Sequence, residues 1–128
     1  MSKRPDKRQR SYTAYDSRFY TEEYMPRREA QVSREIASAL RHMGWRVYNF
    51  ASKKSLPAAV AGFPDLVAFR PGLPVFFIQV KAEQGGRLSD EQREFAEIVT
   101  ADTGAIYVQA SSLDDVLDKL RTMGAIMI

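Results

Sequence analysis

Apolar residues recur at helical spacing in the first periodic segment of the chain. This segment, about Arg27–Met43, predicts an amphipathic helix through Val32, Ile36, Ala39, Leu40 and Met43, which lie three or four positions apart. Gly44 follows it and is typical of a helix end. Trp45–Phe50 contains β-forming side chains and predicts a strand. It leads into a predicted loop, Ala51–Phe63, which contains serine, lysine, proline and glycine.

Two further segments are dense in apolar residues. Asp65–Phe69 and Val75–Lys81 each have the composition of a strand that is buried on both faces of a sheet. Arg70–Pro74 lies between them and is a turn by its proline and glycine content.

The second half of the sequence alternates helix and strand. Ser89–Gln92 has the form of a helix capping box and predicts a helix that runs to about Thr100. We expect the inward face of this helix to carry Phe95, Ile98 and Val99. Ala105–Gln109 predicts another strand. Ser112 opens a last helix, whose apolar stripe consists of Leu113, Val116, Leu117 and Leu120.

The predicted element order is therefore α-β-β-β-α-β-α. A strand, a crossover helix and the next strand favour a right-handed parallel pairing of the third and fourth strands. The first three strands can form an antiparallel meander. We expect an α/β fold with a mixed central β-sheet flanked by helices. The apolar C-terminus, Met123–Ile128, suits either an edge strand or an interface.

Polar side chains converge at one end of the predicted strand pair. If the turn is symmetric about Gly72, Asp65 faces Gln79, and directly opposed residues hold their Cβ atoms about 5 Å apart. Lys81 lies on the same face, because side chains alternate along a strand. Two interpretations stay open. One is a structural ion pair between Asp65 and Lys81 with Gln79 as a hydrogen-bonding neighbour, and the other is a magnesium site.

Glu29 is a further candidate ligand, from the first predicted helix. At about 100° per residue, Glu29 falls on the same stripe as the apolar residues of that helix. An inward-facing carboxylate near the start of the helix can reach the mouth of the sheet, which is the end of the strand pair where Asp65 and Gln79 are expected. The alternative is a glutamate that the helix dipole favours near an N-terminus.

The net charge of +3 is concentrated in the N-terminal arm. Residues 1–10 carry five basic side chains, Arg8 and Arg10 among them, against one aspartate. We assign residues 1–26 to a basic, tyrosine-rich and partly disordered arm, and 27–128 to one domain. Such an arm suits contact with phosphates and stacking on bases. The alternative is a solvated terminus that binds nothing specific.

Composition excludes several kinds of site. The sequence has no cysteine, which excludes disulfides, Cys-ligated zinc, iron–sulfur clusters and a thiolate nucleophile. His42 is the single histidine, which argues against a catalytic triad or a multi-histidine zinc site. No apolar run reaches the roughly 20 residues of a membrane span. We therefore expect an intracellular protein whose chemistry rests on carboxylates, amides, lysines or a bound metal.

Four segments, in order, resemble a known nuclease family. Gly62–Leu66, followed by Phe76–Lys81, resembles the split PD…(D/E)xK signature of restriction-like nucleases. Gly85–Gln92 is similar to the G-x-L-S-x-x-Q segment of their VRR-NUC branch, and Glu29–Gly44 resembles the first helix of that branch. The resemblance covers about residues 27–121.

The resemblance implies a restriction-endonuclease-like core and a metal-dependent DNA endonuclease. It implies one or two Mg²⁺ ions, with Mn²⁺ as a substitute, held by Glu29, Asp65, Gln79 and the backbone carbonyl of Val80. Lys81 would orient and help to deprotonate the attacking water. Stand-alone members of this branch resemble homodimeric Holliday-junction resolvases. That likeness implies branched DNA as the substrate, a homodimer, and a place in DNA repair or recombination at the nucleoid, in the cytoplasm of a bacterial or phage-infected cell.

Position 79 departs from the family pattern, which usually has Glu or Asp there, with Gln as a known variant. An amide oxygen can still bind Mg²⁺, but Gln79 removes one negative charge, which lowers metal affinity and favours one metal over two. We interpret the protein as an active junction-cutting nuclease. The alternatives are a catalytically inert DNA-binding module of the same fold and a nicking or homing-type endonuclease.

Three further residues are candidate DNA contacts. Gln92 either closes the capping box with Ser89 or reaches the metal site or DNA. Lys53 and Lys54 lie in the predicted loop before Gly62, and they are either phosphate contacts or side chains of a solvated loop.

Overall fold

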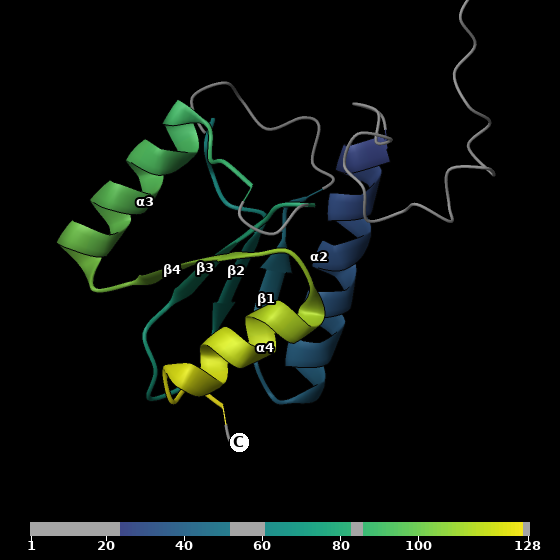
Figure 1. The fold of residues 1–128 in the computed structure, drawn as a ribbon. Coiled ribbons are helices and arrows are strands. Elements are labelled where there is room, and N and C mark those ends of the chain that lie inside the picture. Colours follow the sequence, from purple (N-terminus) through teal and green to yellow (C-terminus); the bar gives the residue numbers. More distant parts are fainter. Residues whose placement is uncertain (1–23, 52–60, 83–85, 127–128) are drawn as a thin grey trace, which may run out of the picture.

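A computed structural model describes residues 24–51, 61–82 and 86–126. Its helices and strands follow the predicted order (Figure 1): α2 (Tyr24–His42), β1 (Arg46–Asn49), β2 (Leu66–Phe69), β3 (Phe76–Val80), α3 (Asp90–Thr103), β4 (Ile106–Ala110) and α4 (Leu113–Thr122). Within these ranges, no helix is long and apolar enough to cross a membrane.

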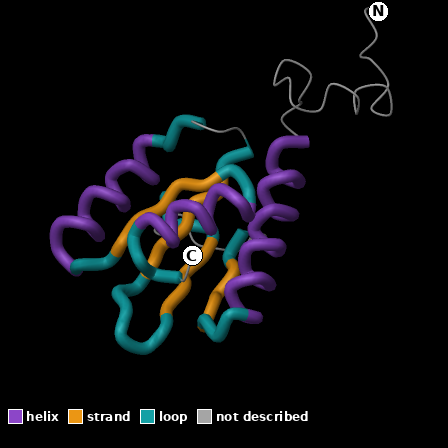
Figure 2. The backbone as a smooth tube through the Cα atoms, turned by 60° about the horizontal axis from the view of Figure 1, so that its bottom comes forward, coloured by secondary structure: helices purple, strands orange, loops and turns teal. Residues whose placement is uncertain are grey.

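The four strands form one mixed sheet in the order β1-β2-β3-β4. β1 pairs with β2 and β2 with β3 in the antiparallel direction, whereas β3 and β4 run parallel. The parallel pair is joined by a crossover that contains α3, as Figure 2 shows. The predicted meander, the predicted parallel pair and the predicted fold class are confirmed.

The hairpin of β2 and β3 has the predicted register. Val67 pairs with Phe77, which is the pairing expected for a turn that is symmetric about Gly72. The register continues across the parallel pair, where Phe77 lies opposite Tyr107. Because side chains alternate along each strand, these three residues lie on one face of the sheet.

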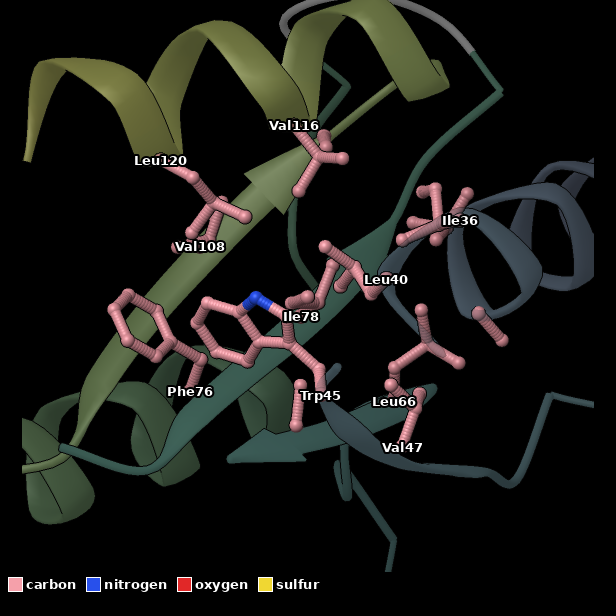
Figure 3. Close-up of a cluster of buried hydrophobic side chains, with 14 of the residues drawn as sticks. Ile36, Leu40, Trp45, Val47, Leu66, Phe76, Ile78, Val108, Val116 and Leu120 are labelled. Atoms are coloured by element: carbon pink, nitrogen blue, oxygen red, sulfur yellow. The ribbon is translucent and has the colours of Figure 1, made fainter. Parts of the chain in front are cut away.

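The main hydrophobic core lies between the other face of the sheet and helices α2 and α4 (Figure 3). Strand residues Leu66, Phe76, Ile78 and Val108 pack there against fully buried side chains of the two helices, which are Ile36, Leu40, Val116 and Leu120. The ring of Trp45 meets the ring of Phe76 edge to face, with 5.4 Å between the centroids. This core fixes which face of each strand points away from α2 and α4.

Helix α3 covers part of the face of the sheet that points away from α2 and α4. The ring of Phe95 in α3 lies 5.2 Å from the ring of Phe77 and 6.3 Å from that of Tyr107, between centroids. No residue of α3 is fully buried, so every side chain of this helix keeps some contact with solvent.

One predicted inward position is wrong. Ile98 is 55% exposed, because α3 meets the sheet along the line of Phe95 and the half-buried Val99, which leaves Ile98 on an uncovered flank. Met43 is also exposed, because α2 ends at His42, where the backbone turns.

The element boundaries differ from the predicted ones by up to three residues. α2 begins at Tyr24 rather than Arg27. α3 continues beyond Thr100 to Thr103 and ends at Gly104, whose φ of 74° is the left-handed conformation common at helix ends. In the C-terminal segment, the described residues 123–126 form no strand, and Ala125 and Ile126 pack against the core instead.

Candidate metal centre

Asp65 and Gln79 meet at one end of the β2–β3 hairpin, as the register predicts. Nε2 of Gln79 donates a hydrogen bond to Oδ2 of Asp65 over 2.9 Å. The backbone N–H of Val80 donates to the same oxygen over 3.0 Å. Both donors use Oδ2, which leaves Oδ1 of Asp65 as the oxygen available to a ligand.

The surroundings of Asp65 disfavour its negative charge. Burial is the largest effect and raises the pKa of Asp65 to about 6. The hydrogen bond from Val80 opposes this rise in pKa, the negative charge of Glu29 adds to it, and the positive charge of Lys81 opposes it. The charges of Glu29 and Lys81 therefore both act on the carboxylate of Asp65.

Glu29 reaches the sheet from helix α2. Its Oε2 accepts a hydrogen bond from the backbone N–H of Ala82 over 2.9 Å, just beyond the end of β3. The first turn of α2 contains no acidic residue, so Glu29 lies too far along the helix for the dipole to explain its position. The expectation that Glu29 faces inward towards the mouth of the sheet is confirmed.

Lys81 directly follows β3. Its backbone N–H donates to the carbonyl of Ala110 over 2.9 Å, which ties the residue to the end of β4. The ion pairs among the described residues lie on α3 and α4 and do not join Asp65 to Lys81. The interpretation of Asp65 and Lys81 as a simple structural ion pair is therefore not supported.

Gln79 has one buried oxygen without a partner. The residue is 3% exposed, and its Oε1 is buried with no hydrogen-bond donor among the described residues. Leaving a buried acceptor unsatisfied costs about 1–3 kcal/mol, so such an atom calls for an explanation. An amide oxygen is a ligand that hard cations such as Mg²⁺ accept.

The donors at this site fit a hard divalent cation. They comprise the carboxylates of Glu29 and Asp65, the amide oxygen of Gln79 and the carbonyl oxygen of Val80. The two carboxylates repel each other, and a cation between them would relieve that repulsion. No group of three or more acidic, histidine or cysteine side chains gathers in the described part of the protein. The amide and the backbone oxygen would therefore have to complete the ligand set.

The loop that carries Asp65 packs directly on helix α3. Gly62 has a φ of 86°, and a Cβ atom at this position would lie 2.5 Å from the carbonyl carbon and the carbonyl oxygen of Glu91. The next residue, Phe63, meets Phe95 edge to face, with 5.5 Å between ring centroids. These contacts place the first turns of α3 beside the loop that leads into Asp65.

Sequence reasoning missed Tyr107. Its Oη is buried and has no hydrogen-bond partner among the described residues. Burial, and then the negative charge of Asp65, raise the pKa of Tyr107 to about 12, so the hydroxyl lies within electrostatic reach of that carboxylate. The available signal was the alternation along the predicted strand, which places Tyr107 on the same face as Gln109, the partner of Gln79 across β3 and β4.

The predicted capping box at the start of α3 is confirmed. Oγ of Ser89 accepts a hydrogen bond from the backbone N–H of Gln92 over 3.1 Å, and Oε1 of Gln92 accepts one from the N–H of Ser89 over 2.9 Å. A contact of Gln92 with metal or DNA stays a prediction. The other candidate DNA contacts lie outside the described residues, namely Lys53, Lys54, Arg8 and Arg10.

Comparisons with known proteins agree with this fold. Residues 24–106 match a family model described as archaeal Holliday junction resolvase (Hjc). A solved structure titled "VRR_NUC domain" is similar in fold, with a TM-score of 0.57 and 22% sequence identity, over 74% of this protein and 95% of that one. A search of the curated proteins finds no match. The resemblance to a VRR-NUC domain is confirmed for the fold, and the chain belongs to the archaeal Holliday junction resolvase (Hjc) family of nucleases.

Proposed function

We propose that the protein is a metal-dependent endonuclease that hydrolyses phosphodiester bonds in branched DNA, with the four-way junction as its preferred substrate. The observation that carries the proposal is the unsatisfied Oε1 of Gln79, which is buried beside Asp65. Glu29 and Lys81 act electrostatically on the same carboxylate. Membership of a nuclease family supports the reaction class.

Four oxygen donors would hold the cation: Oδ1 of Asp65, a carboxylate oxygen of Glu29, Oε1 of Gln79 and the carbonyl oxygen of Val80. Mg²⁺ is the expected ion, with Mn²⁺ as a substitute, because all four donors are hard oxygen ligands. When bound, the ion polarises the scissile phosphate and stabilises the negative charge that develops on it.

The protein positions the attacking water through its own side chains. Nζ of Lys81 donates a hydrogen bond to the attacking water and orients it towards the phosphorus. Lys81 also offsets the negative charge of Asp65. The hydrogen bond from the N–H of Ala82 to Glu29 holds α2 against the end of β3. The carboxylate of Glu29 therefore keeps its position relative to the metal-binding oxygens of the sheet.

A homodimer is part of the proposal. A four-way junction presents pairs of equivalent strands, and two sites related by a two-fold axis can cut such a pair symmetrically. The expected products are therefore two nicks placed symmetrically about the junction centre.

The test is cleavage of labelled four-way junction, flap, single-stranded and plain duplex DNA with Mg²⁺, Mn²⁺ or EDTA. The parent should make paired, symmetric, metal-dependent cuts in the junction. Lys81→Ala should cut at least about a hundredfold more slowly and bind the junction normally. Arg121→Ala is the matched control, because it removes a cation from the exposed face of α4. If Lys81→Ala cuts as fast as this control, the proposed role of Lys81 is wrong.

One observation favours a second candidate, a DNA-binding module without activity. Gln79 already donates to Asp65, so the carboxylate has partners without any cation. A binder of this kind would show salt-dependent affinity for DNA that is insensitive to Mg²⁺. Tight junction binding without cutting in either metal would favour this candidate over the nuclease.

A further inference from the structure

Tyr107 carries a hydroxyl group that the fold does not use. The residue lies in β4 opposite Phe77 of β3, and its ring packs on Phe95 of α3. The ring of Phe77 in turn meets those of Phe63 and Phe95 edge to face. A phenylalanine at position 107 would make the same ring contacts, so packing alone gives no reason for the hydroxyl.

The hydroxyl is also unfavourable where it lies. Oη of Tyr107 is buried and has no partner among the described residues. A buried donor that has lost its bond to water and gained none in the protein destabilises the fold. Buried tyrosine hydroxyls usually find a partner, so one without a partner calls for an explanation, and a role in binding a ligand is one such explanation.

The position of Tyr107 indicates where that ligand would lie. Val67, Phe77 and Tyr107 form one row across β2, β3 and β4. The next row, on the same face, places Gln79 opposite Gln109. A tyrosine is long enough to reach from one row to the next. The register places Gln79, the hydrogen-bond partner of Asp65, in the row next to Tyr107, and the negative charge of Asp65 contributes to the raised pKa of Tyr107.

A second orphaned atom lies in the neighbouring row. Oε1 of Gln79 is an acceptor without a donor, and Oη of Tyr107 is a donor without an acceptor. Nε2 of Gln109 donates to the carbonyl of Gly86, and it makes no hydrogen bond to Oε1 of Gln79. The two groups suit neighbouring parts of one ligand. Oε1 of Gln79 suits a cation, and the hydroxyl of Tyr107 suits an oxygen atom bound next to that cation.

We propose that the hydroxyl of Tyr107 is a further hydrogen-bond donor of this site. It donates to an oxygen atom that is held beside Asp65 and Gln79 only when the cation is bound, either of a water in the DNA-free protein or of a phosphate when DNA is bound. This inference rests on the proposed nuclease function and adds a residue to its site. The hydroxyl makes this hydrogen bond only when the cation is bound. Without the cation, the unsatisfied hydroxyl lowers the stability of the fold.

The experiment compares Tyr107→Phe with Tyr48→Phe, which removes the hydroxyl of an exposed tyrosine on the same face of the sheet. Without metal, Tyr107→Phe should unfold at the same temperature as the parent or a few degrees higher, because it removes an unsatisfied group. If the acceptor is water, the affinity of Tyr107→Phe for Mn²⁺, measured by calorimetry, should be about tenfold lower than that of the parent. If the acceptor is a phosphate oxygen, Mn²⁺ affinity should hold and single-turnover junction cleavage should fall about tenfold. Tyr48→Phe should match the parent throughout.

Two results would overturn the inference alone. One is a Tyr107→Phe protein that equals the parent in Mn²⁺ affinity and in cleavage. The other is a lower unfolding temperature without a change in either, which is the behaviour of a structural hydroxyl bonded to a buried water. A parent that binds no Mn²⁺ and cuts no DNA would instead overturn the proposed function, and the inference with it.

Discussion

Gln79 donates a hydrogen bond from Nε2 to Oδ2 of Asp65 over 2.9 Å, across the paired strands β2 and β3. A glutamate at position 79 has no donor to offer at neutral pH. It would also place a third negative charge near Asp65 and Glu29. The amide therefore stabilises the arrangement of the site without a cation and weakens the attraction that a cation experiences there.

We expect Gln79→Glu to shift this balance. The metal-free variant should be less stable by about 2 kcal/mol, because a hydrogen bond to a charged group is lost and a repulsive charge is gained. Its affinity for Mg²⁺ should rise. Denaturant unfolding with EDTA and with saturating Mg²⁺, together with calorimetric titration, measures both effects.

The control for this substitution is Gln31→Glu, which adds the same charge on the exposed face of α2. It should leave the affinity for Mg²⁺ unchanged. An identical metal titration for the parent and Gln79→Glu would remove residue 79 from the ligand set.

The contribution of Asp65 to the stability of the metal-free protein should fall as the pH rises from about 4 to about 6. Asp65 has its pKa raised from 3.8 to about 6 in the fold, so the folded protein binds a proton more tightly than the unfolded protein in this window. The stabilisation by the protonated form is complete below pH 4 and is lost as the pH rises through 6, a change of up to about 3 kcal/mol.

Asp65→Asn tests this pH dependence, because an asparagine oxygen can still accept from the N–H of Val80 but does not titrate. The difference in unfolding free energy between parent and variant should vary with pH only between about 4 and 6. A difference that stays constant over this window would show that Asp65 titrates normally.

Gly62→Ala should destabilise the protein by about 2 kcal/mol or more. The φ of 86° is strained for alanine, and the added methyl group would collide with backbone atoms of Glu91. Gly72→Ala is a matched control, since its φ is 85° and nothing lies within 4 Å of the added atom. If unfolding by urea shows equal losses for both variants, strain alone is responsible and the contact with α3 is unimportant.

Ser89→Ala and Gln92→Ala should each weaken the start of α3, by about 1 kcal/mol for the serine and less for the glutamine. If Gln92 only caps the helix, both variants should bind junction DNA like the parent. A loss of affinity in Gln92→Ala that Ser89→Ala does not share would give Gln92 a direct role in DNA binding. Equilibrium binding in Ca²⁺, alongside thermal unfolding, separates the two roles.

Features with a local cause could be predicted from the sequence. The turn around Gly72 sets the register that brings Asp65 to Gln79, and helical periodicity alone places Glu29 on the inward face of α2. The capping box that opens α3 likewise depends on residues three positions apart. The fold class followed from these elements and from the rule for parallel crossovers.

Features that depend on packing between distant segments could not be predicted. The raised pKa of Asp65 results mainly from burial, and burial depends on how loops and helices close over the strand ends. The wrong assignment of Ile98 has the same origin, because the sequence of α3 does not reveal how narrow its contact with the sheet is. Tyr107 was missed because an aromatic residue in an apolar strand is typical of a core position.

Helix α3 has no fully buried residue, yet it lies against the loop that leads into Asp65. Such an element can detach without unfolding of the main core between the sheet, α2 and α4. Amide hydrogen exchange should therefore be fast along α3 and slow along α2. Opening of α3 would give water transient access to the site, so a ligand bound beside Asp65 should slow exchange in a helix that it does not touch.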